Sequence, residues 1–246
     1  MTFQPLLIKF TSPRPITPFS PTWDFALGEN NISNKINFNR LKKFLLSKEE
    51  EVLKIDKELN DAGTGLGLDS TTSRFMSYNV LEWDQEDIRI IKEQIILTHN
   101  KYYGYTVSSP YFVPSDLTAS NQKPPLIKLW AWMNIMRKGE QIKKHNHGYD
   151  SKKDTTYLSG NFVVSCDEKT SKTIYINPII HISEKEILEK IDYFGDNHLP
   201  WVYASKNNVG NLTIFPSYVP HFTTQHTSDT ERITLGFEIE PHYENN

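Results

Sequence analysis

Three histidines in the C-terminal half of the chain have the residue type and spacing of a metal site. His145 and His147 are two residues apart in KKHNHGYD, so a strand there would place both imidazoles on one face. Two neutral imidazoles in that arrangement can bind one metal ion, and a further ligand must then come from another strand. His221, in the aromatic and proline-rich run FPSYVPHF, is the best candidate for that ligand.

The remaining histidines and the single cysteine limit which residues can be metal ligands. A His-x-His pair alone is a weak signal, and we expect the other histidines on the surface or in loops: His99, His181, His198, His226 and His242. Cys166 is the only cysteine, which excludes a cysteine-rich zinc site within one chain. A metal here must be held by imidazole or carboxylate, the ligands of Zn, Fe, Mn, Ni or Cu.

A basic residue near the C-terminus suggests an anion site. In ERITLGFEI, Arg232 and Thr234 share one face of a predicted strand. A guanidinium that faces the interior of a barrel is costly unless it meets an anion, and its planar fork suits a carboxylate. The Thr234 hydroxyl could add a hydrogen bond to the same anion. The alternative is a surface arginine on an edge strand.

These residues lie in a part of the chain with the period of β-strands. From Ile127 one predicted face carries Trp130, Trp132, Asn134 and Met136, and the other carries Leu129, Ala131, Met133 and Ile135. We predict further strands over 155–166, 173–177, 212–215 and 232–240, and a helix from Ser183, where Ser183 and Glu186 match a capping box. Short antiparallel strands in this number favour a jelly roll or a similar barrel.

The N-terminal half is different in composition. Five prolines within the first 35 residues predict an extended or irregular segment draped over the body. Helices are predicted to about Leu46, from about Lys48 after a break at a Ser47/Glu50 capping box, and from Gln85 to Tyr103 with Asp84 as N-cap. Residues 63–73 and 105–125 should be loops. We therefore expect an α+β protein whose N-terminal helices pack on the outside of the barrel.

Composition and charge exclude several classes of protein. With 246 residues, 37% hydrophobic and 23% charged, the chain should fold around a buried core. No apolar run is long enough for a membrane helix and no signal peptide is evident, so we expect a cytoplasmic protein without a membrane partner. The net charge of −3 does not indicate nucleic-acid binding. A specific nucleic-acid target nevertheless stays possible, because a local run of basic residues lies beside the histidines: Arg137, Lys138, Lys143, Lys144, Lys152 and Lys153.

Taken together, five blocks of the sequence resemble the iron(II)- and 2-oxoglutarate-dependent dioxygenases. More closely, the chain is similar to the 2-oxoglutarate oxygenase family found in bacteria and tailed phages. The blocks, in the family's order, are WAWMNIMRKG (130–139), HNH (145–147), LSGNF (158–162), NLTIFPSYVPH (211–221) and RITLGF (232–237). The resemblance covers about 120 residues and leaves the N-terminal half without a motif.

The resemblance implies a double-stranded β-helix, a jelly-roll or cupin-like barrel with Fe(II) at its mouth. His145 and His221 match the two histidine ligands, but His147 occupies the position of the usual carboxylate. His147, Asp150 or water could therefore be the third ligand, and we favour His147 because it shares a face with His145. By resemblance, Arg232 and Thr234 bind the distal carboxylate of 2-oxoglutarate. Asn134 and Ser159 would line the same co-substrate pocket.

The implied activity is that of a hydroxylase that couples the decarboxylation of 2-oxoglutarate to succinate with C–H oxidation of an unknown substrate, using O₂. One alternative is a cupin-type three-histidine metalloenzyme that does not use 2-oxoglutarate. Another is a non-catalytic, metal-stabilised module. We expect a single domain over 1–246, with a helical and loop part (1–125) and a barrel core (126–242). Its insert, residues 179–208, is predicted to act as a lid. A phage-encoded protein acting in its host's cytoplasm would fit.

Overall fold

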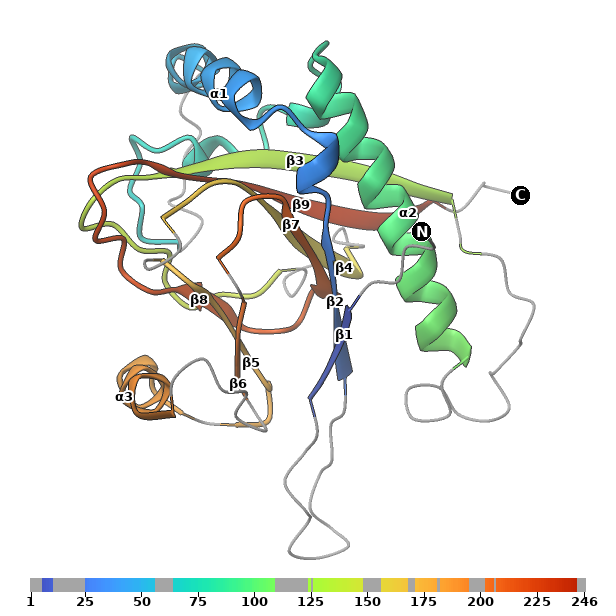
Figure 1. Cartoon of the computed structure of the whole chain (residues 1–246), viewed down its shortest axis with the longest axis vertical. Coiled ribbons are helices and arrows are strands. Elements are labelled where there is room, and N and C mark those ends of the chain that lie inside the picture. Colours follow the sequence, from blue (N-terminus) through green and yellow to red (C-terminus); the bar gives the residue numbers. More distant parts are fainter. Residues whose placement is uncertain are drawn as a thin grey trace, which may run out of the picture.

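The structure is a computed structural model, and it describes residues 6–10, 25–55, 64–108, 124, 126–147, 156–167, 171–180, 182–194, 202–205 and 207–242. These residues form two antiparallel β-sheets with helices around them (Figure 1). The helices are α1 (Phe38–Leu53), α2 (Glu86–Ser108) and α3 (Glu184–Phe194), with 3-10 turns at Ser33–Lys35, Thr72–Arg74 and Val80–Glu82.

The larger sheet has six strands in the order β1-β2-β7-β4-β9-β3. Their bounds are β1 Leu6–Phe10, β2 Phe25–Asn31, β7 Asn211–Pro216, β4 Leu158–Ser165, β9 Arg232–His242 and β3 Leu126–Met136. The smaller sheet has the order β6-β5-β8, with β6 Val202–Ala204, β5 Thr173–Ile176 and β8 His221–Thr223. Among the described residues these remain two separate sheets, and no closed barrel forms.

The main core lies between the larger sheet and the N-terminal helices. α1 and α2 lie on the same side of this sheet, whereas α3 lies beside the smaller one (Figure 1). The apolar face of α2 is buried, and it joins one cluster with alternate residues of β9: Ile88, Ile91 and Ile95 with Ile233, Leu235, Phe237 and Ile239. Burial of these side chains stabilises the fold because each removes apolar surface from water.

The predicted strands of the C-terminal half are confirmed as β3, β4, β5, β7 and β9, with ends within a few residues of those expected. The helix after Ser183 is also confirmed. Its capping box is formed, because the Ser183 Oγ accepts a bond from the Glu186 N–H at 3.2 Å and the Glu186 carboxylate accepts one from the Ser183 N–H at 3.0 Å.

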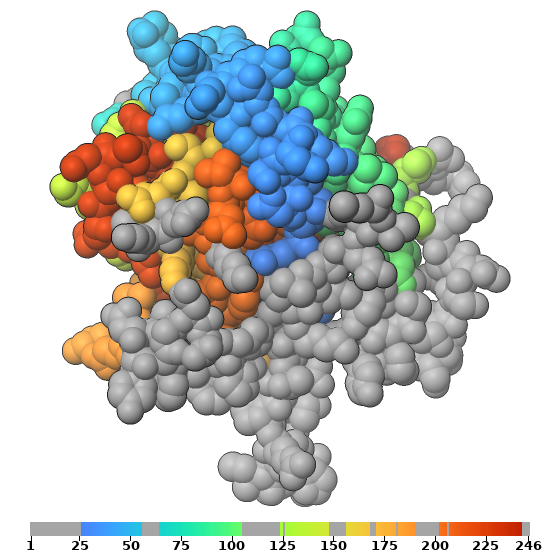
Figure 2. All heavy atoms as spheres, in the orientation of Figure 1, coloured from blue at the N-terminus to red at the C-terminus, as the bar shows by residue number. Residues whose placement is uncertain are grey.

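The N-terminal segment differs from the prediction. Instead of only draping over the body, it contributes the antiparallel pair β1 and β2, and β2 extends the larger sheet by pairing with β7. In Figure 2, blue N-terminal atoms lie directly against orange atoms of the C-terminal half. The prolines that argued for irregular chain, such as Pro13 and Pro18, lie outside the described residues. The strands β6 and β8, each three residues long, were also not predicted.

The break predicted near Ser47 is wrong, because α1 is continuous. The Ser47 hydroxyl donates to the Phe44 carbonyl at 2.7 Å, so it bonds within the helix instead of capping a new one. The cap is Asn37, whose side chain accepts a bond from the Arg40 N–H. At the start of α2, Gln85 and not Asp84 bonds to the free N–H of Ile88, at 2.9 Å.

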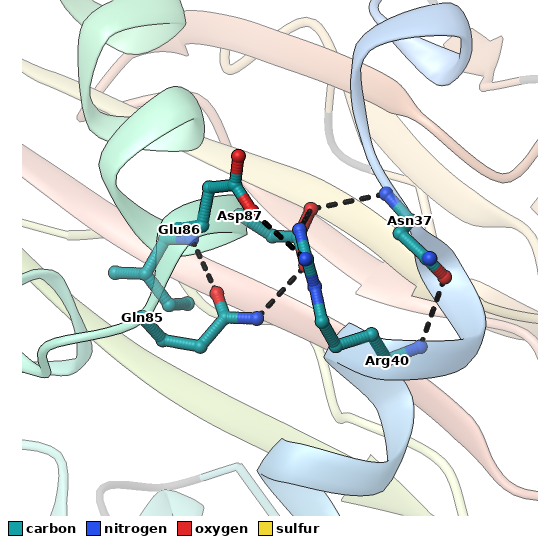
Figure 3. Close-up of polar contacts among 6 residues, drawn as sticks. Asn37, Arg40, Gln85, Glu86 and Asp87 are labelled. Carbon is teal, nitrogen blue, oxygen red and sulfur yellow. Dashed lines mark hydrogen bonds and ion pairs between the residues drawn. The ribbon is translucent and has the colours of Figure 1, made fainter.

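A buried ion pair joins the first turns of α1 and α2 (Figure 3). The Asp87 carboxylate is 1% exposed and accepts bonds from the Arg40 guanidinium at 2.7 and 2.9 Å. It also accepts from the Asn37 N–H at 3.0 Å and from the Gln85 amide at 2.8 Å. Burial alone would raise the pKa of Asp87, but these bonds outweigh it and the pKa lies below its usual value. Within the described parts of the chain, no helix combines the length and apolarity that crossing a bilayer requires.

Candidate metal centre and co-substrate pocket

A cavity of about 710 Å³ is lined by residues of both sheets. β3 and β9 contribute the face opposite to the helical core, and the smaller sheet contributes β5 and β8. The cavity brings together six of the seven residues singled out from the sequence: His145, His147, His221, Arg232, Thr234 and Asn134. Ser159 is the exception.

The three histidines form a compact cluster. One ligand nitrogen from each lies within 4.8 Å of the other two. His145 and His221 face each other in an antiparallel bridge, with backbone N–O distances of 3.0 and 2.9 Å. His147 is fixed separately, because its N–H donates to the Ser217 carbonyl at 2.9 Å. The His-x-His segment therefore runs beside the chain that leads into β8, which places all three imidazoles together.

Each imidazole of the cluster has its Nδ1 occupied by an outer acceptor. The Nδ1 of His145 lies 2.8 Å from the Lys143 carbonyl, and that of His221 lies 3.0 Å from the Val219 carbonyl. The Nδ1 of His147 lies 2.8 Å from the Glu238 carboxylate. Since all three partners are acceptors, each Nδ1 carries a proton, and in the neutral form of each ring the lone pair is on Nε2.

Burial keeps two imidazoles of the cluster, those of His145 and His221, neutral at neutral pH. Desolvation by burial and the nearby His147 lower the pKa of His145 to about 4. Burial, followed by the charges of His145 and His147, lowers the pKa of His221 well below its usual value. Metal ligands must be unprotonated, so these imidazoles can bind a metal at neutral pH. Three neutral imidazoles suit a divalent first-row ion, Fe(II) included.

Arg232 is a buried cation with few partners. Its side chain is 2% exposed, and its Nη2 donates to the Thr173 hydroxyl at 2.9 Å, while Nη1 lies 3.8 Å from the Met136 sulfur. The Nε atom has no hydrogen-bond partner, and no carboxylate of the described residues pairs with the guanidinium. Burial lowers the pKa to about 10, so the group stays charged at neutral pH. A buried, unpaired cation beside a cavity calls for an anion within it.

The neighbours of Arg232 are polar and oriented. Thr234 is 2% exposed and follows Arg232 on the cavity face of β9. Asn134 is its register partner on β3, and the Asn134 Oδ1 accepts a bond from the Thr72 hydroxyl at 2.7 Å. Ser159 is fully buried on β4, does not line the cavity, and its Oγ has no partner among the described residues.

Several cavity residues were not singled out from the sequence, Thr72 and Glu238 among them. Thr72, from the loop predicted over 63–73, orients Asn134, and a loop without a period gives no signal of such contacts. Glu238 contacts His147 directly. Extending the period of two from Arg232 along β9 would have found Glu238, because it shares the face of Arg232 and Thr234.

The remaining histidines depart in part from expectation. His99 and His226 are fully buried, so placing them on the surface was wrong. His99 contacts the Tyr157 hydroxyl, and His226 lies between the Ser171 hydroxyl and the Thr230 carbonyl, which satisfies both rings internally. His242 is exposed as predicted, whereas His181 and His198 lie outside the described residues, as does Asp150.

The basic run beside the histidines is partly neutralised. Arg137 pairs with Glu49 at 2.9 Å and Lys138 with Asp229 at 2.8 Å, while Lys152 and Lys153 lie outside the described residues. Two of the six basic residues are therefore paired with an acid.

The described part of the predicted lid, residues 179–208, does not line the histidine cavity. Ile180 and Ile182 line a separate, smaller pocket of about 310 Å³, next to Lys144 and Pro220. The side chains of Phe194 and Trp201, also expected at the rim, lie outside the described residues.

Comparison with solved structures finds matches at low identity and low TM-score. A 2OG-Fe(II) oxygenase family oxidoreductase from Burkholderia pseudomallei is 10% identical with a TM-score of 0.39; the match covers 65% of this chain and 61% of that protein, under two thirds of its length. A prolyl-4-hydroxylase from Pseudomonas putida is 10% identical with a TM-score of 0.47, over 88% and 93% of the two chains. HygX from Streptomyces hygroscopicus, solved with nickel and 2-oxoglutarate, is 13% identical with a TM-score of 0.34, over 56% and 68%.

No curated protein matches the sequence. The family assignment rests on residues 130–238, which match the model of a family described as putative 2OG-Fe(II) oxygenase. This segment contains the three histidines and Arg232. The cofactor and co-substrates of such enzymes are Fe(II), 2-oxoglutarate and O₂. Through this segment the chain is similar to the 2-oxoglutarate- and Fe(II)-dependent oxygenases.

Proposed function

We propose that the protein is a hydroxylase in which His145, His147 and His221 bind Fe(II). Arg232, helped by Thr234, binds the distal carboxylate of 2-oxoglutarate, and the 2-oxo acid end of the co-substrate faces the metal. Decarboxylation of 2-oxoglutarate to succinate and CO₂ is coupled to oxidation of a C–H bond in a prime substrate. Bound Fe(II) supplies the redox chemistry with O₂.

The observation that carries this proposal is one cavity with two complementary features. One ligand nitrogen from each of three imidazoles lies within 4.8 Å of the other two, and a buried guanidinium without a carboxylate partner among the described residues lines the same space. A dicarboxylate with a 2-oxo group satisfies both, because one end offers oxygen ligands to a metal and the other offers an anion to Arg232.

The other cavity residues orient and shield the co-substrate. Because the Thr72 hydroxyl fixes the Asn134 carbonyl oxygen, the Asn134 amide nitrogen is left to donate into the cavity. Trp132 packs beside His147 with 5.7 Å between ring centroids, and Phe215 packs against His221 at 4.8 Å. These aromatic rings limit the access of water to the histidines, which strengthens the electrostatic interactions within the cavity. Ser159 stays a candidate neighbour of the co-substrate, since its buried hydroxyl lacks a partner among the described residues.

We also propose that the two sheets are those of a double-stranded β-helix and that the whole chain is one domain. The pairing of β2 with β7 supports this, since it joins the N-terminal part to the sheet that carries Arg232.

A three-histidine metalloenzyme that does not use 2-oxoglutarate is the second candidate. The absence of a carboxylate from the described ligand cluster favours it. Arg232 speaks against it, because without an anionic co-substrate this buried cation would have no partner within the described structure.

The test is succinate formation by purified protein supplied with Fe(II), O₂ and 2-oxoglutarate. Loss of a buried charged partner costs about 2–5 kcal/mol, so Arg232→Ala should raise the KM for 2-oxoglutarate roughly 30-fold or more. Arg137→Ala removes a guanidinium outside the cavity and should leave that KM unchanged. Metal-loaded protein that consumes no 2-oxoglutarate, or turnover indifferent to Arg232→Ala, would support the second candidate instead.

A further inference from the structure

The three histidines of the cluster do not have equivalent outer partners. His145 and His221 each donate from Nδ1 to a backbone carbonyl, two residues earlier in the chain in both cases. His147 donates instead to a carboxylate, that of Glu238, at 2.8 Å. A carbonyl only fixes the tautomer of the ring, whereas a carboxylate also adds a negative charge.

Glu238 is held where it can act on His147 alone. It lies on the cavity face of β9, is 19% exposed, and its second oxygen lies 3.5 Å from the Thr156 hydroxyl. Its oxygens are not part of the cluster of ligand atoms within 4.8 Å, which contains only the three imidazoles among the described residues. Glu238 therefore contacts the outer side of His147 and is not itself a member of the metal cluster.

The His147 ring is also clamped on its faces. It stacks with Trp132 at 5.7 Å and an interplanar angle of 26°, and with His221 at 5.1 Å and 11°. With the backbone N–H bonded to Ser217, Nδ1 bonded to Glu238 and two rings stacked on it, the orientation of the imidazole is fixed. Because Nδ1 is bonded to Glu238, Nε2 is the nitrogen left to bind a metal.

The charge of the site explains why a carboxylate is useful at this point. The sequence resemblance places a carboxylate ligand where this chain has His147, so the ligand set is more positive by one charge. A carboxylate bonded to Nδ1–H of a metal-binding imidazole raises the basicity of that ligand. Glu238 restores a negative charge next to the one ligand position from which it is missing.

We propose that Glu238 is a positioning residue for the metal centre: it orients His147 and, through it, supplies the anionic character that the ligand set lacks. This inference rests on the proposed role of the three histidines as metal ligands. It makes the His147–Glu238 pair, and not His147 alone, the counterpart of a carboxylate ligand.

The first test measures the affinity of the purified full chain for Co(II), a redox-stable substitute for Fe(II), by competition with a chromophoric chelator. Glu238→Gln keeps the shape and a hydrogen-bond acceptor but removes the charge, and it should weaken Co(II) binding by about 10–100-fold. Glu238→Asp keeps the charge and should retain more affinity than Glu238→Gln. The matched control is Glu240→Gln, two residues along the same face of β9, which should leave Co(II) binding unchanged.

The second test reverses the sign of the effect. His147→Asp places a carboxylate at the ligand position itself, so Glu238 then faces a like charge and has no N–H to accept. In that background Glu238→Gln should tighten Co(II) binding or leave it unchanged, whereas in the wild type it weakens binding. A residue with a merely structural role would show the same loss in both backgrounds.

The outcomes separate this inference from the function on which it rests. Wild-type protein that binds Co(II) no better than His221→Ala would overturn the metal site itself. Wild-type binding that is tight and equal to that of Glu238→Gln would overturn only the role of Glu238. An equal loss for Glu240→Gln would show a general effect of cavity charge and would also contradict the proposed contact.

Discussion

The two faces of the larger sheet are built from the same strands, but one packs in the core and the other lines the cavity. Along β9, Ile233, Leu235 and Phe237 pack into the core beneath α1 and α2, while Arg232 and Thr234 face the cavity. On β3, Met133 and Ile135 belong to the core and Asn134 lines the cavity, while Trp132 contacts both. Because side chains of a strand alternate between faces, neighbouring residues serve stability and chemistry in turn.

The faces also differ in how their charges are satisfied. On the helical side, Arg40 is paired with a carboxylate, because Asp87 accepts two hydrogen bonds from the Arg40 guanidinium. On the cavity side, Arg232 has a hydroxyl and a sulfur as neighbours but no acid among the described residues. A paired buried charge is a structural contact, whereas an unpaired one marks a place where a ligand completes the site. Substitutions on the two sides should therefore fail in different assays.

The largest effect is expected on the cavity face. His221→Ala removes the ligand that joins the His-x-His segment to β8, and two imidazoles should not retain Fe(II) at micromolar concentration. Succinate formation should fall to the background of the metal-free protein. The measurement is 2-oxoglutarate turnover together with bound iron after desalting. Normal turnover with a full complement of iron would remove His221 from the site.

The control for this variant lies elsewhere among the histidines. His226→Ala removes an imidazole of the same size that is fully buried, is bonded to Ser171 and Thr230, and is not a member of the three-histidine cluster. It should lower stability without removing iron from the protein that remains folded.

The next effect belongs to the helical face. Phe237→Ala deletes a fully buried ring one residue from the cavity face, and such truncations cost about 3–5 kcal/mol of unfolding free energy. Chemical denaturation should show this loss, while the KM for 2-oxoglutarate of the folded fraction stays close to that of the wild type. A large change in this KM with little loss of stability would contradict the assignment of stability to one face of the sheet and of co-substrate binding to the other.

The residues of the cavity face could be predicted from the sequence because they recur with a period of two along a few strands. That period put Asn134 and Trp132 together, and it put Thr234 next to Arg232, which is how the structure has them. The pairing of His145 with His221 is a contact between segments far apart in the chain. Spacing alone could only suggest it.

Other features depend on contacts that leave no pattern in the sequence. Thr72 reaches Asn134 from an irregular loop, and Ser47 bonds within α1 although its surroundings match a capping box. The sheet pairing of β1 and β2 was masked by the prolines around them. Local signals describe local preferences, and tertiary contacts decided each of these cases.

The smallest effect tests the paired charge on the helical side. Asp87→Asn should cost about 1–2 kcal/mol, because it removes a charge-assisted contact whose partner Arg40 is half exposed. Since the pKa of Asp87 is lower in the folded than in the unfolded chain, its contribution is complete above the unfolded value and is lost as the pH falls through the folded value. The wild type should therefore lose its advantage over Asp87→Asn in acid, below about pH 4.

Glu86→Gln is the matched control. Glu86 pairs with the same arginine at 2.8 Å but is 62% exposed, so its loss should cost less than about 0.5 kcal/mol. Equal effects of the two variants on the unfolding midpoint would mean that burial does not distinguish these acids, and that the contrast between Arg40 and Arg232 does not arise from burial either.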